Sequence, residues 1–227
     1  TAHSISFATG AETFTHTDFV LDAPLPIGWS RTYRSQLSAY DSGNLGARWL
    51  TPYSTRIDVV GKGKPTALLH HGADGRSHRY PWLGVGEKHY DPVEQITLTR
   101  MSSTLLTLDF GKPLPEGEPS PWRETYELVD TVRSKAADMG KEHFRLIALH
   151  NRDGAALGLR YDHVVANGTH AAEEVLSDIV SKQGETIVAH AATRIDPDSG
   201  RILGLWEIKD GKLLRQLAAY DYDRSEE

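Results

Sequence analysis

The hydrophobic and polar positions of this chain alternate over short runs and do not follow the spacing of a long helix. Runs rich in β-branched and aromatic residues are separated by Gly, Asp, Asn and Pro through most of the 227 residues. Runs of this kind, bounded by turn residues, are typical of strands joined by tight turns. The pattern therefore predicts an all-β, mostly antiparallel fold.

Asp-Gly pairs mark the sharpest predicted reversals. They occur at Asp74-Gly75, Asp153-Gly154 and Asp210-Gly211. Asp tolerates and Gly prefers the positive φ that two-residue hairpin turns of the primed types require. We expect each pair to reverse two antiparallel strands, the second pair joining strands at 144–149 and 156–161.

Three more strands are predicted at 186–194, 201–208 and 212–222, as a C-terminal meander. The Pro- and Glu-rich stretch from 114 to 121 is expected to be an exposed loop. From 169 to 181 the apolar residues have helical spacing, so a short helix competes there with a strand. These residues are Ala172, Val175, Leu176, Ile179 and Val180.

Composition and charge narrow the function classes. The formal net charge is −6, and Lys and Arg do not gather into a stripe, which argues against nucleic-acid binding. Cysteine is absent, so disulfides, thiolate metal sites and Cys nucleophiles are excluded. No stretch approaches the roughly 18 apolar residues of a membrane helix. The N-terminus also lacks the pattern of a signal peptide.

A dipeptide provides the repeat signal. Tyr-Asp occurs five times among nine tyrosines and seventeen aspartates, where chance predicts fewer than one. Its positions are 40–41, 90–91, 161–162, 220–221 and 222–223. A Tyr at a strand end can bury its ring against the neighbouring strand, while the following Asp turns the chain by binding its own backbone. Repeated hairpins would repeat this pair.

These dipeptides and the turn elements at 74–76, 198–201 and 210–212 resemble YD repeats, and 211–223 is the most similar stretch. A long ordered N-terminal motif resembles the region that opens the repeat shell of Rhs proteins. It comprises Ala8-Thr9-Gly10-Ala11-Glu12, Thr17-Asp18-Phe19, Pro24-Leu25-Pro26-Ile27-Gly28-Trp29-Ser30-Arg31-Thr32-Tyr33-Arg34-Ser35 and Leu45-Gly46-Ala47-Arg48-Trp49. The resemblance covers residues 4–60 and 144–223 and leaves 100–143 without a recognisable repeat.

The resemblance to the Rhs/YD-repeat family implies a fold and a role. Hairpins of the family join into one spiralling sheet that encloses a C-terminal toxin, often delivered by a type VI secretion spike. We therefore expect a non-catalytic shell fragment, made in the bacterial cytoplasm and secreted, that needs no cofactor. Its expected partners are the toxin domain and the rest of the shell, and possible further ones are spike and chaperone proteins. The expected organisation is a shell-opening region at 1–60, a β-rich segment with a loop or insertion at 61–143, and YD hairpins at 144–227.

The family's Asp-Pro-rich cleavage motif has no counterpart. The Asp196-Pro197-Asp198 sequence lies in a predicted turn, so no autoprotease residues are assigned. The chain also begins without Met and ends within a continuing pattern, which favours a fragment of a longer protein. An isolated shell fragment would leave edge strands unpaired, and we expect it to self-associate.

Catalytic and metal-binding alternatives have weaker support. A histidine cluster at His70, His71, His78 and His89 has no known ligand spacing, so no metal residues are assigned. The acidic pairs Asp196/Asp198 and Glu173/Glu174 are interpreted as turn formers or solvated residues, although a glycosidase would need two such groups. We assign no catalytic or cofactor-binding residues.

A carbohydrate-binding or cell-surface β module is the alternative function, because exposed indoles stack on sugars. The five tryptophans are Trp29, Trp49, Trp82, Trp122 and Trp206. Core packing is the expected role of most of them, and Trp29 and Trp49 are expected to hold the N-terminal segment together.

Overall fold

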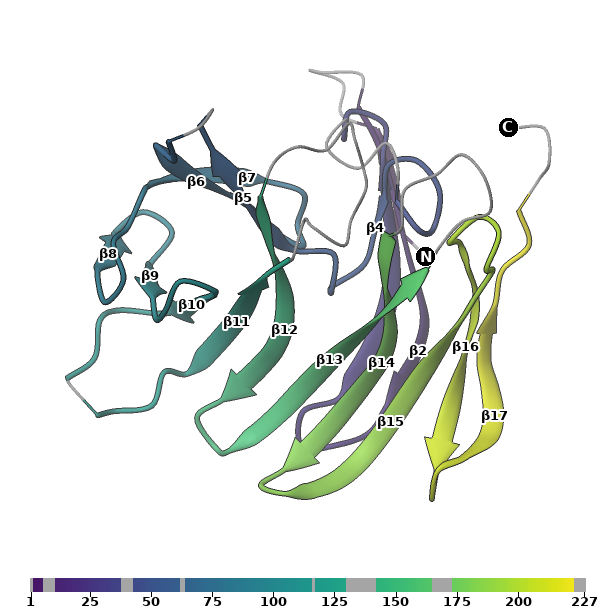
Figure 1. The fold of residues 1–227 in the computed structure, drawn as a ribbon. Coiled ribbons are helices and arrows are strands. Elements are labelled where there is room, and N and C mark those ends of the chain that lie inside the picture. The colour runs from purple at the N-terminus through teal and green to yellow at the C-terminus, as the bar shows by residue number, and fades with distance from the viewer. Residues whose placement is uncertain are drawn as a thin grey trace.

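The fold is all-β, as the sequence predicted. The computed structural model describes residues 2–5, 11–37, 43–61, 64–115, 117–129, 142–164 and 173–222. Every regular element in these ranges is a strand, and the paired strands run antiparallel (Figure 1). The described residues contain no helix that could cross a membrane.

Seventeen strands are described. The first nine are β1 (Ala2–Ile5), β2 (Glu12–Leu21), β3 (Ile27–Arg34), β4 (Trp49–Leu50), β5 (Arg56–Val60), β6 (Ala67–His71), β7 (Ser77–Pro81), β8 (Lys88–Asp91) and β9 (Ile96–Arg100). The others are β10 (Leu105–Phe110), β11 (Trp122–Leu128), β12 (His143–Asn151), β13 (Ala155–Val164), β14 (Glu173–Gln183), β15 (Thr186–Ile195), β16 (Ile202–Lys209) and β17 (Lys212–Ala219). The loop predicted at 114–121 lies between β10 and β11.

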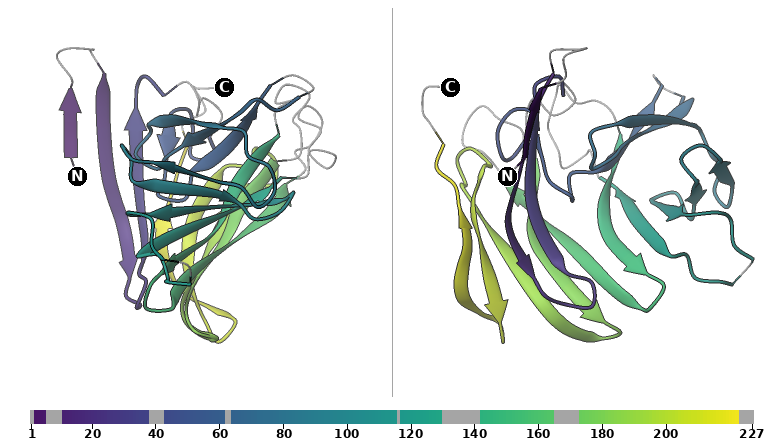
Figure 2. Two further views of the ribbon diagram at one scale, coloured as in Figure 1. Left: turned by 90° about the vertical axis from the view of Figure 1, so that its left-hand side faces the viewer. Right: turned by 180° about the vertical axis from the view of Figure 1, so that it is seen from behind.

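The strands form two sheets. Strands β1 to β4 make a four-stranded sheet, and β5 to β17 make a 13-stranded sheet in which each strand from β8 to β17 pairs with its neighbours in that run of the chain. Strand β12 pairs in addition with β5. The larger sheet curves into a wall. Seen from behind, β2 and β3 lie across strands β13 to β15 (Figure 2, right), and β2 and β3 contact β14, β15 and β17.

The core fills the space between the two sheets. Its buried residues come from β2 and β3 on one side and from β13 to β16 on the other, and the same cluster continues through β5 to β12. Leu21, Ile27 and Trp29 represent the first group, and Ile179 and Leu205 the second. The large sheet therefore buries one face against the N-terminal strands, and these strands close the core.

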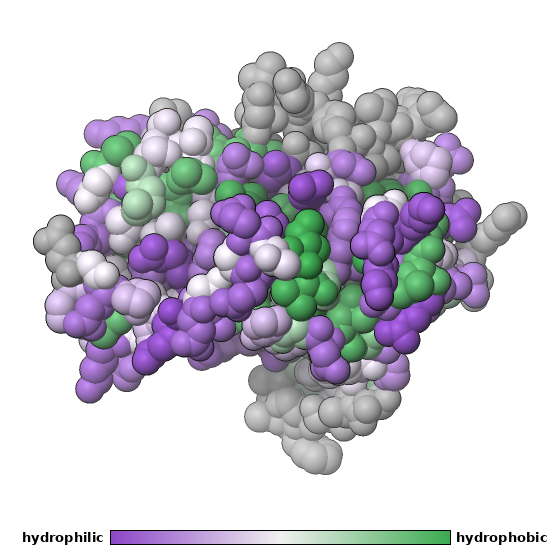
Figure 3. All heavy atoms as spheres, turned by 90° about the horizontal axis from the view of Figure 1, so that it is seen from below, coloured by the Kyte–Doolittle hydropathy of each residue, from purple (hydrophilic) through white to green (hydrophobic). Residues whose placement is uncertain are grey.

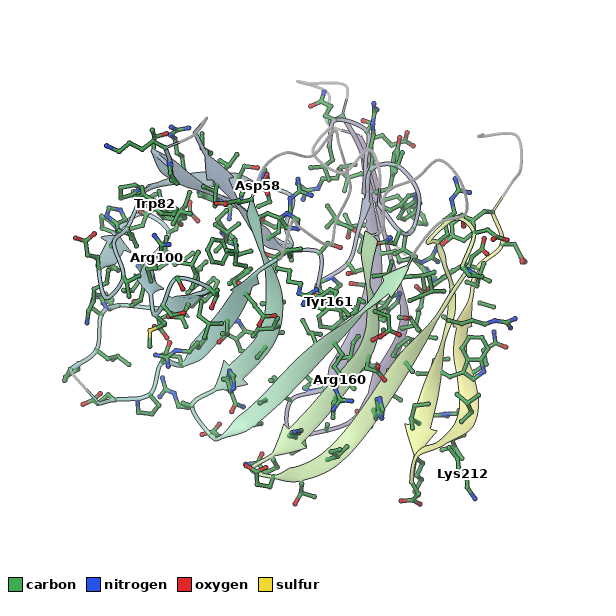
Figure 4. The ribbon with its side chains drawn as sticks, viewed as in Figure 1. Asp58, Trp82, Arg100, Arg160, Tyr161 and Lys212 are labelled. Atoms are coloured by element: carbon green, nitrogen blue, oxygen red, sulfur yellow. The ribbon has the colours of Figure 1, made fainter. Side chains whose placement is uncertain are left out.

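The large sheet forks at β12. The first residues of β12, 143–145, pair with β5, whereas residues 148–150 pair with β13. Tyr161 of β13 fills the fork, and its hydroxyl donates to the Leu146 carbonyl at 2.6 Å (Figure 4). The Arg145 guanidinium lies 4.6 Å from the centroid of the Tyr161 ring. A ring and a cation thus fill the wedge where the two arms separate.

All three Asp-Gly pairs reverse the chain, but only one does so as predicted. Asp210 and Gly211 form a two-residue turn with φ of 50° and 71°, as a type I′ turn requires. The other two turns are longer, at 72–76 and 152–154. Side-chain acceptors close these turns: the carboxylate of Asp74 binds the Arg76 N–H, and the Asn151 side chain binds two backbone N–H groups of its own turn.

The segment from 173 to 183 is a strand, so the helical alternative is wrong for the described residues; 169–172 lie outside them. A bulge explains the misleading spacing. Arg160 pairs with Asp178 and Tyr161 pairs with Leu176, which leaves Ser177 as an extra residue. Val180 is also buried although its neighbour Ile179 points into the core. Burial on both faces together with one bulge imitates a helical pattern.

Candidate functional site at the junction of the two sheets

The junction begins at a bulge in β2. Thr17 pairs with Ser30 and Phe19 pairs with Trp29, so Asp18 is an extra residue between two ladder positions. Its carboxylate accepts hydrogen bonds from Nε and Nη2 of Arg31 at 2.7 and 2.9 Å. A bidentate pair of this kind fixes both side chains in one geometry.

Tyr220, just after β17, connects this pair to the other end of the chain. Its hydroxyl donates to Asp18 Oδ2 at 2.8 Å and accepts from Trp29 Nε1 at 2.8 Å. These bonds join residues 202 and 191 positions apart. The Arg31 guanidinium lies 4.5 Å from the Tyr220 ring centroid and 5.6 Å from that of Trp49.

The protonation states suit this network. Burial, and next the bond to Asp18, raise the pKa of Tyr220 well above its ordinary value, so its hydroxyl keeps the proton that it donates. Burial opposes the charge of Arg31, but the bond and the charge of Asp18 outweigh it and raise the pKa of Arg31. Across the physiological pH range the Tyr220 hydroxyl therefore stays protonated, between the Asp18–Arg31 ion pair and the Trp29 indole.

A second set of contacts holds the 43–48 loop on the C-terminal strands. The backbone carbonyl of Asn44 accepts a hydrogen bond from the Ile202 N–H at 2.9 Å. The side-chain amide of Asn44 donates to the Gly200 carbonyl. The Tyr222 hydroxyl donates to the Ile202 carbonyl at 2.6 Å, and the Arg201 guanidinium lies 4.9 Å from the Tyr222 ring centroid. The Tyr222 hydroxyl also lies 3.4 Å from the Asn44 carbonyl, so the tyrosines of two successive Tyr-Asp pairs contact the N-terminal region.

A cleft of about 690 Å³ lies beside these contacts, and Tyr33, Trp49 and Tyr222 are among its lining residues. Two of its arginines are held by residues beside the cleft: Arg31 by Asp18, and Arg48 by the Ser35 carbonyl. Trp49 contacts Phe14 and Tyr33 by ring packing. The contacts described around the cleft connect the N-terminal strands to the C-terminal ones.

The histidines that are close in the sequence do not form one site, because each contacts different residues. His71 binds Ser77 and Asp58, and His78 lies 3.6 Å from Glu94. His89 contacts the ring of Tyr80. No group of three or more His, Asp or Glu side chains within the described ranges is placed to hold a metal ion.

His70 belongs to a buried polar chain that the sequence did not predict. Its Nε2 lies 3.0 Å from Thr55 Oγ1, which lies 2.8 Å from the Tyr126 hydroxyl; that hydroxyl donates to Glu124. Burial, and next the charge of His78, lower the pKa of His70 to about 4. Burial raises the pKa of Glu124. His70 is therefore neutral at pH 7, and its Nδ1 has no hydrogen-bond partner among the described residues.

The acidic pair at 196 and 198 forms a turn, as interpreted. Asp196 accepts from the Asp198 N–H and from the Ser199 hydroxyl. Those bonds, led by the Ser199 hydroxyl, lower the pKa of Asp196. The side chains of Glu173 and Glu174 lie outside the described part of the chain.

The tryptophans follow the prediction in part. Trp29 is 1 % exposed, and Trp82 and Trp122 pack against the core. Trp49 lies half-buried in the aromatic cluster of the N-terminal segment. Trp206 belongs neither to the core nor to the residues packed against it.

The Tyr-Asp pairs differ in what they do. Asp91 turns the chain as predicted, since its carboxylate accepts from the Val93 and Glu94 N–H groups. Tyr161 lies within β13, so the proposed strand-end account is wrong there. The pairs at 40–41 and 222–223 lie wholly or partly outside the described residues.

The sequence motif marked Trp29, Arg31 and Trp49 as a group but did not reveal their partners. Asp18 stands in the quoted Thr17-Asp18-Phe19 motif, and Tyr220 in the closing repeat. The opposite charges of Asp18 and Arg31, at the spacing of two paired strands, could have predicted their ion pair from the sequence. No sequence pattern could have predicted the contact with Tyr220, because that contact depends on how the two sheets pack.

Comparisons with known proteins support a likeness to toxin proteins. A family described as "Domain of unknown function (DUF6531)" matches residues 2–80. Over 114 residues, 47% of this chain, the sequence is 29% identical to double-stranded DNA deaminase toxin A of Burkholderia cenocepacia (strain H111). The chain spans only 8% of the length of that protein.

Two solved structures also match this chain at low sequence identity. The TcdB2-TccC3-TEV structure has a TM-score of 0.45 at 12% identity, covering 86% of this chain and 11% of that one. The N-terminal domain of effector protein SpvB from Salmonella typhimurium strain LT2 has a TM-score of 0.40 at 12% identity, covering 79% and 73%. About the first third of the chain thus matches a family of unknown function. About half of the chain is similar in sequence to a bacterial toxin.

Proposed function

We propose that this chain is a wall segment of a Rhs/YD-repeat toxin shell, without catalytic activity of its own, that helps to enclose and deliver a C-terminal toxin domain. The 29% identity to a DNA deaminase toxin protein supports a toxin context. The proposed partners are the toxin domain and the remaining shell. Delivery by a type VI-like apparatus, in competition between bacteria, belongs to the same proposal.

The observation that carries the proposal is the unbroken path from β8 to β17. Each strand pairs with its neighbours in the chain, β12 pairs in addition with β5, and the path ends in edge strands that can accept further hairpins. The N-terminal strands cover one face of this path and are held there by Tyr220. Such a sheet can be lengthened hairpin by hairpin without changing what is already folded, as a wall requires.

Native purification of the full-length gene product tests the proposal. Intact-mass analysis is expected to find a C-terminal fragment that is separated from the chain and still co-purifies with the part containing residues 1–227. The fragment should resist added protease until the complex is denatured. A single uncut chain whose C-terminal domain is digested as fast as the isolated domain would contradict enclosure.

A further inference from the structure

His71 joins a serine to an aspartate across three neighbouring strands. Its Nδ1 lies 2.8 Å from the Ser77 hydroxyl oxygen, and its Nε2 lies 3.1 Å from Asp58 Oδ2. Asp58 is in β5, His71 ends β6 and Ser77 begins β7. A hydroxyl, an imidazole and a carboxylate bonded in this order are the groups that activate a serine for nucleophilic attack.

The register of the strands brings these three side chains to one face of the sheet. His71 is directly opposite Ser77, and Asp58 is opposite Leu69, two residues before His71. Paired residues share a face, and so do residues two apart on a strand. Ile57, next to Asp58, is fully buried in the core, so the three side chains stand on the face turned away from that core.

The pairing of His71 with Ser77 explains their short contact. The Gly72 N–H donates to the Arg76 carbonyl, which makes these two a hydrogen-bonded position of the hairpin. The next pair, His71 and Ser77, is therefore non-hydrogen-bonded, and side chains lie closer together in such pairs. The Ser77 N–H then points away from β6. Among the described strands β7 pairs with β6 alone, so this N–H lies at an open edge beside the hydroxyl.

The hydrogen bonds fix which ring nitrogen of His71 carries a proton. Burial opposes the charge of Asp58, but the bond from His71 and the charge of Arg56 outweigh it and lower the pKa of Asp58. Asp58 is therefore a carboxylate that only accepts, so His71 Nε2 carries the proton. The lone pair of His71 Nδ1 then accepts the hydrogen bond from the Ser77 hydroxyl.

Ser77 is the accessible member of the group. The side chain of His71 is 7 % exposed and that of Asp58 is 16 % exposed, whereas Ser77 is exposed. The second oxygen of Asp58 accepts from Arg56 Nε at 3.1 Å. The imidazole and the carboxylate are thus held in place, and a reagent can reach the hydroxyl at the strand edge.

We propose that Ser77 is an acylation site, which takes an acyl group from an ester or a thioester. Ser77 Oγ attacks the carbonyl carbon while its proton moves to His71 Nδ1, and the Ser77 N–H donates to the carbonyl oxygen as that oxygen gains negative charge. The bond from the carbon to the leaving oxygen or sulfur then breaks. His71 gives the proton to the leaving group, so the products are a Ser77 ester and an alcohol or a thiol. Asp58 is a positioning residue, because it holds the imidazole and stabilises its positive charge.

This acylation goes beyond the wall role proposed above and does not depend on it. The product keeps the acyl group on the chain, so the reaction is a modification of the wall and not a turnover of substrate. Because Ser77 lies at an open strand edge, the proposal is for small acyl donors whose carbonyl can reach that edge.

Incubation of the chain with p-nitrophenyl acetate, followed by intact-mass analysis and peptide mapping, tests this proposal. The original chain should gain an acetyl group at Ser77 at least about 100-fold faster than N-acetylserinamide is acetylated. Ser77→Ala should lose this label. Ser103→Ala is the matched control, since Ser103 is an exposed serine between β9 and β10, and it should leave the rate at Ser77 unchanged.

Two further variants separate the roles of the imidazole and the carboxylate. His71→Gln removes the base and should slow acetylation about 100-fold or more. Asp58→Asn should slow it about tenfold or more. Nitrogen NMR of the His71 ring should then show the proton shared between Nδ1 and Nε2 instead of held on Nε2, which a purely structural role of Asp58 does not produce.

Circular dichroism shows which variants keep the fold, and the comparison of the original chain with N-acetylserinamide needs no variant. Three results would overturn the proposal. They are an original chain without an acetyl group at Ser77, a rate at Ser77 no faster than that of N-acetylserinamide, and equal rates in the original chain and folded His71→Gln.

Discussion

Replacing Tyr220 with Phe isolates the bond between the ends of the chain. The substitution removes one oxygen atom and retains the ring beside Arg31, 4.5 Å from its guanidinium. The Trp29 N–H then has no acceptor in a site where Trp29 is 1 % exposed. Asp18, whose side chain is 9 % exposed, loses one of its hydrogen bonds but keeps both from Arg31.

The expected cost follows from these losses. A buried donor without a partner costs about 1–3 kcal/mol, and a single hydrogen bond contributes about 1 kcal/mol. We therefore expect the free energy of unfolding to fall by about 2–3 kcal/mol. For a chain of this size that corresponds to a fall in Tm of roughly 5–10 °C.

Urea unfolding followed by tryptophan fluorescence and circular dichroism measures this difference. Tyr90→Phe is the matched control, because Tyr90 also precedes an Asp and its hydroxyl makes no hydrogen bond with any described residue. Tyr90→Phe should change the free energy by less than about 0.5 kcal/mol. Equal losses in the two variants would refute the view that Tyr220 connects the sheets.

Three other changes test separate parts of the fold. The pKa of His70 is about 4 in the folded chain and about 6.5 in the unfolded chain. Between these pH values the unfolded chain therefore binds more protons than the folded chain. The free energy of unfolding should fall by up to about 3 kcal/mol on acidification from pH 6.5 to 4. Urea titrations of the original chain and His70→Gln at pH 7 and pH 5 should show a smaller fall in the variant, and equal pH slopes would contradict this. Gly204→Ala places a Cβ 2.5 Å from a carbonyl of β17 and should cost about 1–3 kcal/mol, whereas Gly158→Ala, with open space around it, should be nearly neutral in the same unfolding assay. Leu213 on the edge strand β17 is 69 % exposed, so light scattering should detect self-association at high concentration that Leu213→Lys reduces; Val93→Lys, in a turn, is the control, and a monomer at every concentration would contradict the prediction.

The last of these rests on exposed aliphatic residues near two hairpin ends. Ile187 and Val188 follow the turn between β14 and β15, and Leu213 and Leu214 follow the turn between β16 and β17. From below, hydrophobic residues lie among hydrophilic ones on the surface of the molecule (Figure 3). Neighbouring residues on these strands are exposed together, so neither face of the strand end is covered.

The sequence predicted the strands better than their packing. Turn residues such as Gly211 and strand patterns such as 144–149 act locally, so they could be read from the chain. The segment containing Ser177 misled because a bulge disturbs the period of two on which the prediction depends. The Thr55–His70–Tyr126 chain and the close approach of the Trp206 ring to Gly204 depend on register and sheet curvature, which no local pattern encodes.

The bond between Asp18 and Tyr220 also sets an order of events during synthesis. At about 5–20 residues per second, the ribosome needs roughly 10–40 s to make the 202 residues that separate them. For most of that interval β2 and β3 exist without β14, β15 and β17, the strands of the large sheet that contact them. The nascent chain therefore presents apolar surface early and covers it late, and chaperones that bind exposed apolar segments should associate with its N-terminal strands until β17 has been made.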